Sequence, residues 1–245
     1  MNTTLAYVKF EILEAVRIPA VFLGLLFMPA GGMFVFVIPT LGSDPGTATM
    51  GTASMCLFAV LIICSAQYGM GIADARMKPW GGYVRTLPGG PVPRMVSMMS
   101  LSLLMTLLGA IPLVLVAALG TEASASPVEL LLGLGALLLA VVPFALVMLA
   151  IGYAVNPYLV AMLTSIVPLV LVVLGGLLAD PYATDGFIAT IAPYTPVRGA
   201  AELVWAAVSD YTPQPASLIA QGAWTVVLAL VAYRAYRADE GRRFH

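Results

Sequence analysis

Residues 128–179, VELLLGLGALLLAVVPFALVMLAIGYAVNPYLVAMLTSIVPLVLVVLGGLLA, form an apolar run that carries one charged residue. A helix crosses the ~30 Å hydrocarbon core of a bilayer with about 20 apolar residues, so this run is roughly twice the length of one crossing. Asn156 and Pro157 stand near its middle and favour a tight turn. The stretch therefore predicts two membrane-spanning helices, 128–153 and 158–179, joined by a short turn.

The whole chain has the same character. Of its 245 residues 61% are hydrophobic and only 9% are charged, and the mean hydropathy is +0.99. Soluble globular chains average about 25% charged residues, so this chain lacks the polar surface that a water-soluble fold needs. We therefore expect an all-α integral membrane protein with six transmembrane helices. The stretches long enough to cross are 18–41, 51–72, 95–119, 128–153, 158–179 and 217–233.

Basic residues predict the orientation, because short cytoplasmic loops carry an excess of Lys and Arg. With the N-terminus inside, the inner segments contain ten of the eleven basic residues, and Arg198 alone lies outside. Six crossings then put both termini in the cytoplasm. The sequence predicts a multi-pass protein of the cell membrane, that is, the inner or plasma membrane.

The first 17 residues are too polar to cross a membrane. As a helix they would separate an apolar stripe from a charged face, which is typical of an amphipathic helix lying in the membrane interface. A frayed leader is the alternative. The stripe contains Leu5, Val8, Ile12 and Val16, and the opposite face contains Glu11, Glu14 and Arg17.

The inner loop 73–94 is elaborate for a simple membrane anchor. Four basic residues stand there against Asp74 alone, and proline–glycine clusters bracket the short segment YVRTL. Basic loops attract anionic lipid headgroups. Since Pro and Gly interrupt helices, we expect one short helical turn that is held between two breaks and presented to the cytoplasm.

The outer loop 180–216 contains two apolar pieces that are too short to span. Thr195 followed by Pro196 predicts a helix N-cap with proline at the first helical position. Arg198 and Glu202 would then share one helix face. We expect short re-entrant helices before the last span, with Trp205 and Tyr211 as interfacial anchors.

Together these features resemble the membrane subunit of ABC-2 type (type V) ABC exporters, and the resemblance covers the whole chain, 1–245, as a single permease domain. In that family the loop after the second span holds a coupling helix, and VRTLPGGPVPRM (84–95) occupies that place here. APYTPVRGAAEL (192–203) is similar to the family's proline-rich stretch ahead of the last span. Many relatives carry an acidic residue and a glycine before the coupling turn, where this chain has ADARMKPWGG.

The resemblance implies a permease subunit of an ATP-driven exporter, which moves an amphipathic or apolar substrate (a drug, an antibiotic or a lipid-like molecule) out of the cell. It implies a separate ATPase subunit that binds ATP and Mg, and a homodimer or a sister permease subunit, all in contact with membrane lipid. The residues that would couple to the ATPase are the apolar Tyr83, Val84 and Leu87 and the basic Arg85 and Arg94.

The residues themselves exclude several kinds of chemistry. Neither Lys9 nor Lys78 has the G-K-[ST] context of a P-loop, so this chain needs a partner for ATP hydrolysis and we do not expect it to be an enzyme. His245 is the single histidine of the sequence, so the residues indicate neither a zinc site nor a histidine-based triad. A net charge of −1 does not indicate nucleic acid as a partner. We expect no cofactor or metal on this chain.

Polar residues inside the spans are candidates for a substrate pathway, because they are costly against lipid. Serine and threonine can instead bond their own helix backbone. The candidates are Gln67, Tyr68, Asn156, Thr164 and Ser165.

Three alternatives remain. An ABC importer permease would carry an EAA-x3-G signature, which residues 73–94 lack. A secondary carrier commonly needs a buried ionisable residue, and no predicted span has one near its centre. A non-transporting membrane assembly protein would be distinguished by failure to co-purify with an ATPase.

Overall fold

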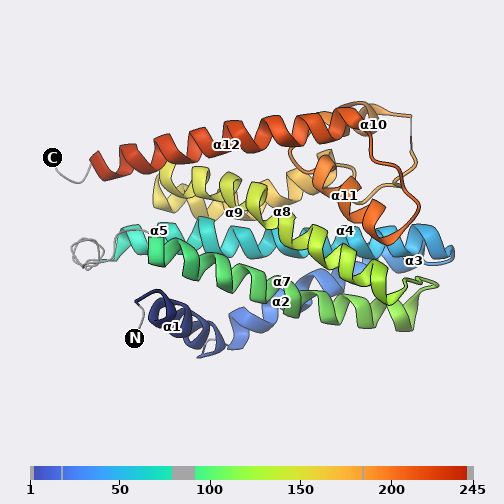
Figure 1. Cartoon of the computed structure of the whole chain (residues 1–245), viewed down its shortest axis with the longest axis horizontal. Helices are drawn as coiled ribbons and strands as arrows, with labels where there is room; N and C mark the ends of the chain where they lie inside the picture. The colour runs from blue at the N-terminus through green and yellow to red at the C-terminus, as the bar shows by residue number, and fades with distance from the viewer. Residues whose placement is uncertain (1–2, 18, 79–91, 184, 242–245) are drawn as a thin grey trace.

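The computed structural model describes residues 3–17, 19–78, 92–183 and 185–241, and every regular element in these ranges is helical. The helices run roughly along the long axis of one elongated bundle (Figure 1). In order they are α1 Thr3–Arg17, α2 Pro19–Gly32, η1 Met33–Val37, α3 Ile38–Leu41, α4 Pro45–Cys64, η2 Ser65–Met70, α5 Gly71–Met77, α7 Val92–Gly120, α8 Pro127–Ala154, α9 Pro157–Leu174, α10 Phe187–Ile191, η3 Ala192–Tyr194, α11 Arg198–Val208 and α12 Pro215–Gly241.

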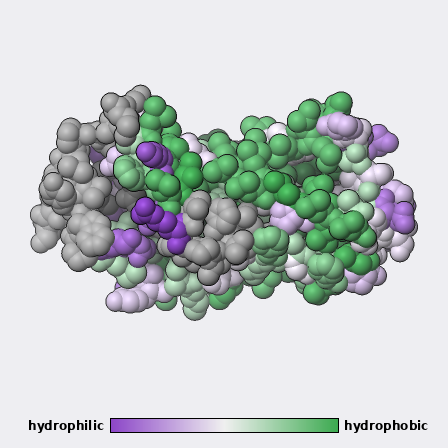
Figure 2. Space-filling view, turned by 90° about the horizontal axis from the view of Figure 1, so that it is seen from below, coloured by the Kyte–Doolittle hydropathy of each residue, from purple (hydrophilic) through white to green (hydrophobic). Residues whose placement is uncertain are grey.

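Five helical segments are long and apolar enough to cross a membrane, which confirms the prediction of a helical protein of transmembrane character. Apolar residues cover the middle of the face seen in Figure 2, and most hydrophilic ones lie toward its two ends. At the predicted first span α2, η1 and α3 follow one another from Pro19 to Leu41, and the apolar stretch among the residues with described side chains is Phe27–Leu41, so a sixth span stays a prediction. The five are Pro45–Met77, Met95–Gly120, Pro127–Ala154, Pro157–Leu174 and Pro215–Asp239.

The centre of the bundle is the continuous helix formed by α4, η2 and α5. In its most apolar stretch 83% of the residues are buried, whereas the corresponding figure for α12 is 11%. Small residues fill α4, where the sequence 46–54 reads GTATMGTAS. Small side chains let neighbouring backbones approach closely inside a membrane. The central position of α4 therefore follows from its composition.

The turn between α8 and α9 agrees with the prediction. α8 ends at Ala154 and α9 begins at Pro157. The side-chain oxygen of Asn156 accepts a hydrogen bond from the backbone N–H of Tyr158, at 3.0 Å. Because this bond satisfies a free N–H at the helix start, Asn156 caps α9 and the chain becomes helical again after the turn.

The N-terminal helix forms as expected, and a residue of its predicted charged face contacts the bundle. α1 packs on α7, and a Glu11 carboxylate oxygen accepts a hydrogen bond from the Ser97 hydroxyl of α7. Leu5 is 64% exposed. Glu11, on the predicted charged face, therefore lies against α7, where a hydroxyl gives its carboxylate a partner that a helical wheel cannot reveal.

The two described ends of the chain lie at the same end of the bundle. Thr3 and Gly241 are both found at the end where α5 stops and α7 starts, whereas α3 and α11 lie near the opposite end (Figure 1). We call the first the terminal end and the second the distal end.

Gly152 tests the close packing of α8 on the central helix. A Cβ atom there would lie 2.7 Å from the backbone carbonyl oxygen of Tyr68, whereas a Cβ at Gly135, on the same helix, would meet nothing within 4 Å. We expect Gly152→Ala to lower the free energy of unfolding by about 1–3 kcal/mol through overpacking. Gly135→Ala should leave it unchanged or raise it by about 0.5–1 kcal/mol. Thermal unfolding in detergent measures both, and equal melting temperatures would contradict the packing.

Candidate functional site

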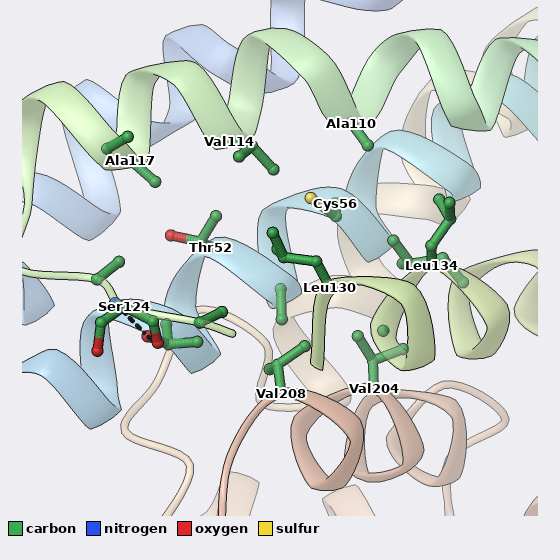
Figure 3. A pocket seen from close by; sticks show the side chains of 17 residues that line it. Thr52, Cys56, Ala110, Val114, Ala117, Ser124, Leu130, Leu134, Val204 and Val208 are labelled. Atoms are coloured by element: carbon green, nitrogen blue, oxygen red, sulfur yellow. Dashed lines mark hydrogen bonds between the residues drawn. The ribbon is translucent and has the colours of Figure 1, made fainter. Parts of the chain in front are cut away.

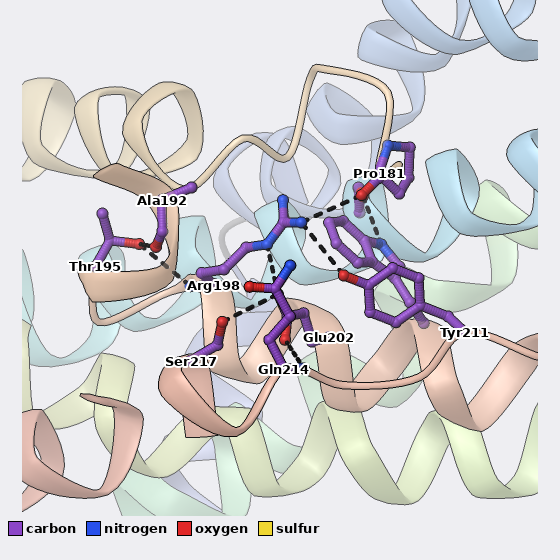
Figure 4. Close-up of polar contacts among 10 residues, drawn as sticks. Pro181, Ala192, Thr195, Arg198, Glu202, Tyr211, Gln214 and Ser217 are labelled. Carbon is purple, nitrogen blue, oxygen red and sulfur yellow. Dashed lines mark hydrogen bonds and ion pairs between the residues drawn. The ribbon is translucent and has the colours of Figure 1, made fainter. Parts of the chain in front are cut away.

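A buried ion pair stands on α11 at the distal end (Figure 4). Arg198 Nε lies 2.8 Å from Glu202 Oε1, one helical turn away, and the two residues are 7% and 0% exposed. This confirms the prediction that the two side chains share a helix face. A buried charge is tolerated only when its hydrogen bonds are made inside the protein, so the surroundings of the pair matter.

Glu202 joins α11 to the start of α12. Its Oε2 accepts a hydrogen bond from the backbone N–H of Gln214 at 2.8 Å, and its Oε1 accepts one from the Ser217 hydroxyl at 3.1 Å. With the Arg198 bond the carboxylate has three donors. The short helix is therefore bound to the first turn of α12 through one side chain.

Arg198 joins α11 to the connections on either side of it. Its Nη2 donates to the carbonyl oxygen of Pro181 at 3.2 Å and to the Tyr211 hydroxyl at 3.4 Å, and its guanidinium carbon lies 4.6 Å from the Trp205 ring centroid. Burial, followed by the Glu202 charge, raises the pKa of Tyr211 above its ordinary value. The phenol therefore stays neutral.

The start of α11 agrees with the predicted cap only in part. The α-helix begins at Arg198, two residues later than Pro196 suggested, and Val197 stands at its N-cap position. The prediction that Thr195 is the N-cap residue is therefore wrong. The Thr195 hydroxyl still accepts a hydrogen bond from the backbone N–H of Arg198 at 3.3 Å, so it gives the first N–H of the helix a partner.

Trp205 and Tyr211 do not act as surface anchors. Trp205 is 0% exposed, and its Nε1 donates a hydrogen bond to the Ser54 hydroxyl of α4 at 3.0 Å. Tyr211 is also buried and stacks edge-on against Trp205, with ring centroids 5.4 Å apart. The expectation failed because α11 packs into the bundle, where a serine of the central helix satisfies the indole N–H.

A second buried ion pair stands at the terminal end. Arg76 Nε, on α5, lies 3.0 Å from Asp239 Oδ1 on α12. Arg76 Nη1 also donates to the carbonyl oxygens of Gly152 at 2.8 Å and Val155 at 2.7 Å, where α8 ends. The sparsely buried α12 is thus fastened to the bundle by charged side chains at both of its ends.

Two of the predicted pathway residues lie in the core around η2. Tyr68 is 3% exposed, and its hydroxyl accepts a hydrogen bond from the Ser102 hydroxyl of α7 at 3.1 Å. The Ser65 hydroxyl donates to the backbone carbonyl oxygen of Thr164 on α9 at 2.7 Å. Sequence reasoning missed Ser65 and Ser102, because an isolated serine in an apolar run carries no signal of its own.

The five pathway candidates are not brought together within this chain. The hydroxyls of Thr164 and Ser165 bond carbonyls of their own helix, as the alternative interpretation allowed. Asn156 is exposed at the α8–α9 turn, and Gln67 is half-buried in η2. A common lining made by these side chains stays a prediction.

The predicted coupling residues Tyr83, Val84, Arg85 and Leu87 lie outside the described residues. Arg94 falls in the first turn of α7, with its side chain outside the description. Among the residues that are described, no cluster of three His, Cys, Asp or Glu side chains could hold a metal ion.

A cavity of about 280 Å³ lies between α4, α7, α8 and α11 (Figure 3). Its walls are built mainly from small and aliphatic side chains, and Cys56 points toward it from α4. No sequence pattern indicated this cavity, because its lining comes from four helices and the 123–125 connection, which are separated in the sequence. The lining residues are Thr49, Thr52, Ala53, Cys56, Ala110, Val114, Ala117, Ala118, Ala123, Ser124, Ala125, Leu130, Gly133, Leu134, Leu137, Val204 and Val208.

Comparisons with known proteins assign no family. No protein-family model matches the chain, and no curated protein is significantly similar to it. Any functional conclusion therefore rests on the residues and the geometry above.

The Arg198–Glu202 pair is expected to be essential for stability. Arg198→Met should lower the free energy of unfolding by about 3–5 kcal/mol, because it leaves the Glu202 carboxylate buried without its counter-charge. The pair Asp74–Lys78 has the same sequence spacing but is exposed, so Lys78→Met should cost about 0–1 kcal/mol. Thermal unfolding in detergent compares the two, and similar losses would show that Glu202 does not depend on Arg198.

Proposed function

We propose that this chain is the membrane-spanning permease subunit of an ATP-driven ABC exporter of the ABC-2 type. The observation that carries the proposal is the folded-back segment between α9 and α12. Its short helices α10, η3 and α11 are joined to the bundle by the buried Arg198–Glu202 pair. The arrangement matches the short re-entrant helices that the sequence resemblance implies ahead of the last span.

The positions of the loops support the same proposal. α5 ends and α7 begins at the terminal end, where the chain's described ends also lie (Figure 1). In the proposed topology this end faces the cytoplasm, the stretch 18–41 is the first of six spans, and α11 dips into the outer leaflet. An ATPase would then contact the basic loop 73–94 of a multi-pass cell-membrane protein.

The ion pair at the terminal end suggests how force would reach the helices. Arg76 follows η2, lies near the start of the basic loop 73–94, and binds both α8 and α12. A pull on the loop would act on α5 and, through Arg76, on the ends of two further helices. Transport by this scheme is a shift between two helix packings that nucleotide binding biases.

The substrate class follows from the same proposal. The cargo is amphipathic or apolar, such as a drug, an antibiotic or a lipid-like molecule, and it moves along a pathway between two permease subunits. ATP and Mg bind to the separate ATPase subunit. Co-purification with an ATPase that carries Walker motifs would separate this proposal from an assembly protein or a secondary carrier.

Coupling is tested by Arg85→Glu combined with Leu87→Ala in the complex with its ATPase. We expect the double variant to hydrolyse ATP while transport is lost, because the charge and the apolar contact in the coupling loop are both removed. Arg234→Glu, an exposed basic residue on α12, serves as the control and should transport normally. Substrate efflux from vesicles and phosphate release measure the two activities. Full transport by the double variant would contradict the proposal that this loop couples the chain to the ATPase.

Orientation is tested with single cysteines in a variant that lacks Cys56 and Cys64. A membrane-impermeant maleimide added to intact cells should label a cysteine at Glu122, at the distal end, and should leave cysteines at Arg85 and Arg234 unlabelled. Permeabilised cells should show labelling at all three positions. Labelling at Arg85 in intact cells would place the loop on the wrong side for an ATPase.

A further inference from the structure

The cavity between α4, α7, α8 and α11 opens sideways. Its inner wall is buried, with Ala53 and Cys56 each 7% exposed and Val204 1% exposed. Val114 on α7 and Leu130 on α8 also line it, and they are 37% and 44% exposed. The exposed lining residues therefore come from these two helices and, at Ser124, from the connection that joins them.

The outer faces of the two helices beside this opening are apolar. α7 and α8 both belong to the segments that are long and apolar enough to span a membrane. Since such faces lie against lipid tails, the opening leads into hydrocarbon. The exposed aliphatic residues flanking it are Ile111, Leu115 and Leu119 on α7 and Val128, Leu131 and Leu132 on α8.

The threonine hydroxyls that line the cavity need no partner from a ligand. The Thr52 hydroxyl donates to the carbonyl oxygen of Ala48 at 2.8 Å. The Thr49 hydroxyl is within hydrogen-bond distance of the carbonyl oxygens of Pro45 and Ser124 and accepts from the Ser124 N–H at 3.1 Å. An occupant of this cavity is therefore held by packing alone, which suits a hydrocarbon.

The size and the apolar walls of the cavity favour an apolar occupant. A volume of about 280 Å³ is roughly twice that of an engineered apolar cavity that binds benzene and excludes water. Side-chain atoms that line an unfilled cavity lack contacting atoms on one side and so lose dispersion energy. Lipid tails are the most concentrated apolar groups at the opening. We propose that the cavity binds the end of one acyl chain of a zwitterionic phospholipid from the leaflet at the distal end.

The rim of the cavity selects the headgroup. Glu122 is exposed and directly precedes the lining residue Ala123. Its backbone N–H donates to the Gly42 carbonyl oxygen at 2.9 Å, which holds this connection against the one that contains the exposed Asp44. Hydrogen bonds from Thr47 lower the pKa of Asp44, so the carboxyl stays ionised. Arg198, the basic residue of this end, is enclosed with Glu202. Two carboxylates repel an anionic headgroup and attract the cation of a zwitterionic one.

The test uses the full chain reconstituted in phosphatidylcholine vesicles. A small fraction of the phosphatidylcholine carries a diazirine at the terminal carbon of one chain. After irradiation, mass spectrometry of the digested protein maps the adducts. We expect adducts on α4 between Thr49 and Cys56, which a chain outside the bundle cannot reach because α4 is buried. Residues of α12 exposed to lipid should be labelled as well.

Two variants fill the cavity from α7, Ala110→Phe and Ala117→Leu. Each should lose the adducts on α4 and keep those on α12, which also show that the variant is folded. Leu115→Phe changes an exposed residue of the same helix and should label like the unaltered chain. Adducts on α4 that persist in both filled variants, or that are absent from the unaltered chain, would overturn the site.

Two further probes test the chemistry of the occupant. Phosphatidylglycerol with the same photoreactive chain should label α4 more weakly than phosphatidylcholine, and equal labelling would overturn the choice of headgroup. A free fatty acid with the same diazirine should compete poorly, and labelling by the fatty acid alone would overturn the phospholipid. None of these outcomes depends on an ATPase, so the exporter proposal stands or fails separately.

Discussion

A charge that is removed from water must find its partners inside the protein, and two arginines impose this requirement at the two ends of the bundle. At the distal end Arg198 and Glu202 bring α11 against the first turn of α12. At the terminal end Arg76 brings α5, the end of α8 and Asp239 of α12 together. Between these points α12 is held by few buried side chains. Since α12 also packs along α8 between these points, the polar contacts fix its two ends and packing holds the part between them.

The central helix shows the complementary principle. α4 and η2 are surrounded on all sides because their glycines, alanines, serines and threonines let other helices approach. At Gly69 a Cβ would lie only 2.2 Å from Thr164 Cγ2, so the side chain of Thr164 on α9 packs directly against the backbone of η2. The same small residues leave space where a neighbouring helix does not follow the surface. The cavity between α4, α7, α8 and α11 is such a place, lined by Ala53 on one helix and Ala110 on another.

Hydrophobic runs were long enough in this sequence to predict the fold class and most of the spans, because a crossing needs an uninterrupted apolar stretch. Local rules also succeeded for the Asn156 turn and the Arg198–Glu202 face, since each depends on residues within one turn, whereas the helix start predicted at Thr195 and Pro196 came two residues too early. Predictions that required knowledge of a neighbouring helix failed or were never made. Trp205 and Glu11 find hydroxyls on other helices, and the link from Arg76 to Asp239 joins residues with no shared pattern.

The double fastening of α12 has a consequence for how the chain is assembled. α12 is synthesised after the helices that it joins, so a growing chain holds Arg76 without the Asp239 carboxylate and Glu202 without the Gln214 and Ser217 donors. Unpaired charged groups in or near lipid are costly. Until α12 is in place, the side chains that bind it lack these partners. Insertion of α12 supplies both sets of partners, one at each end of the bundle.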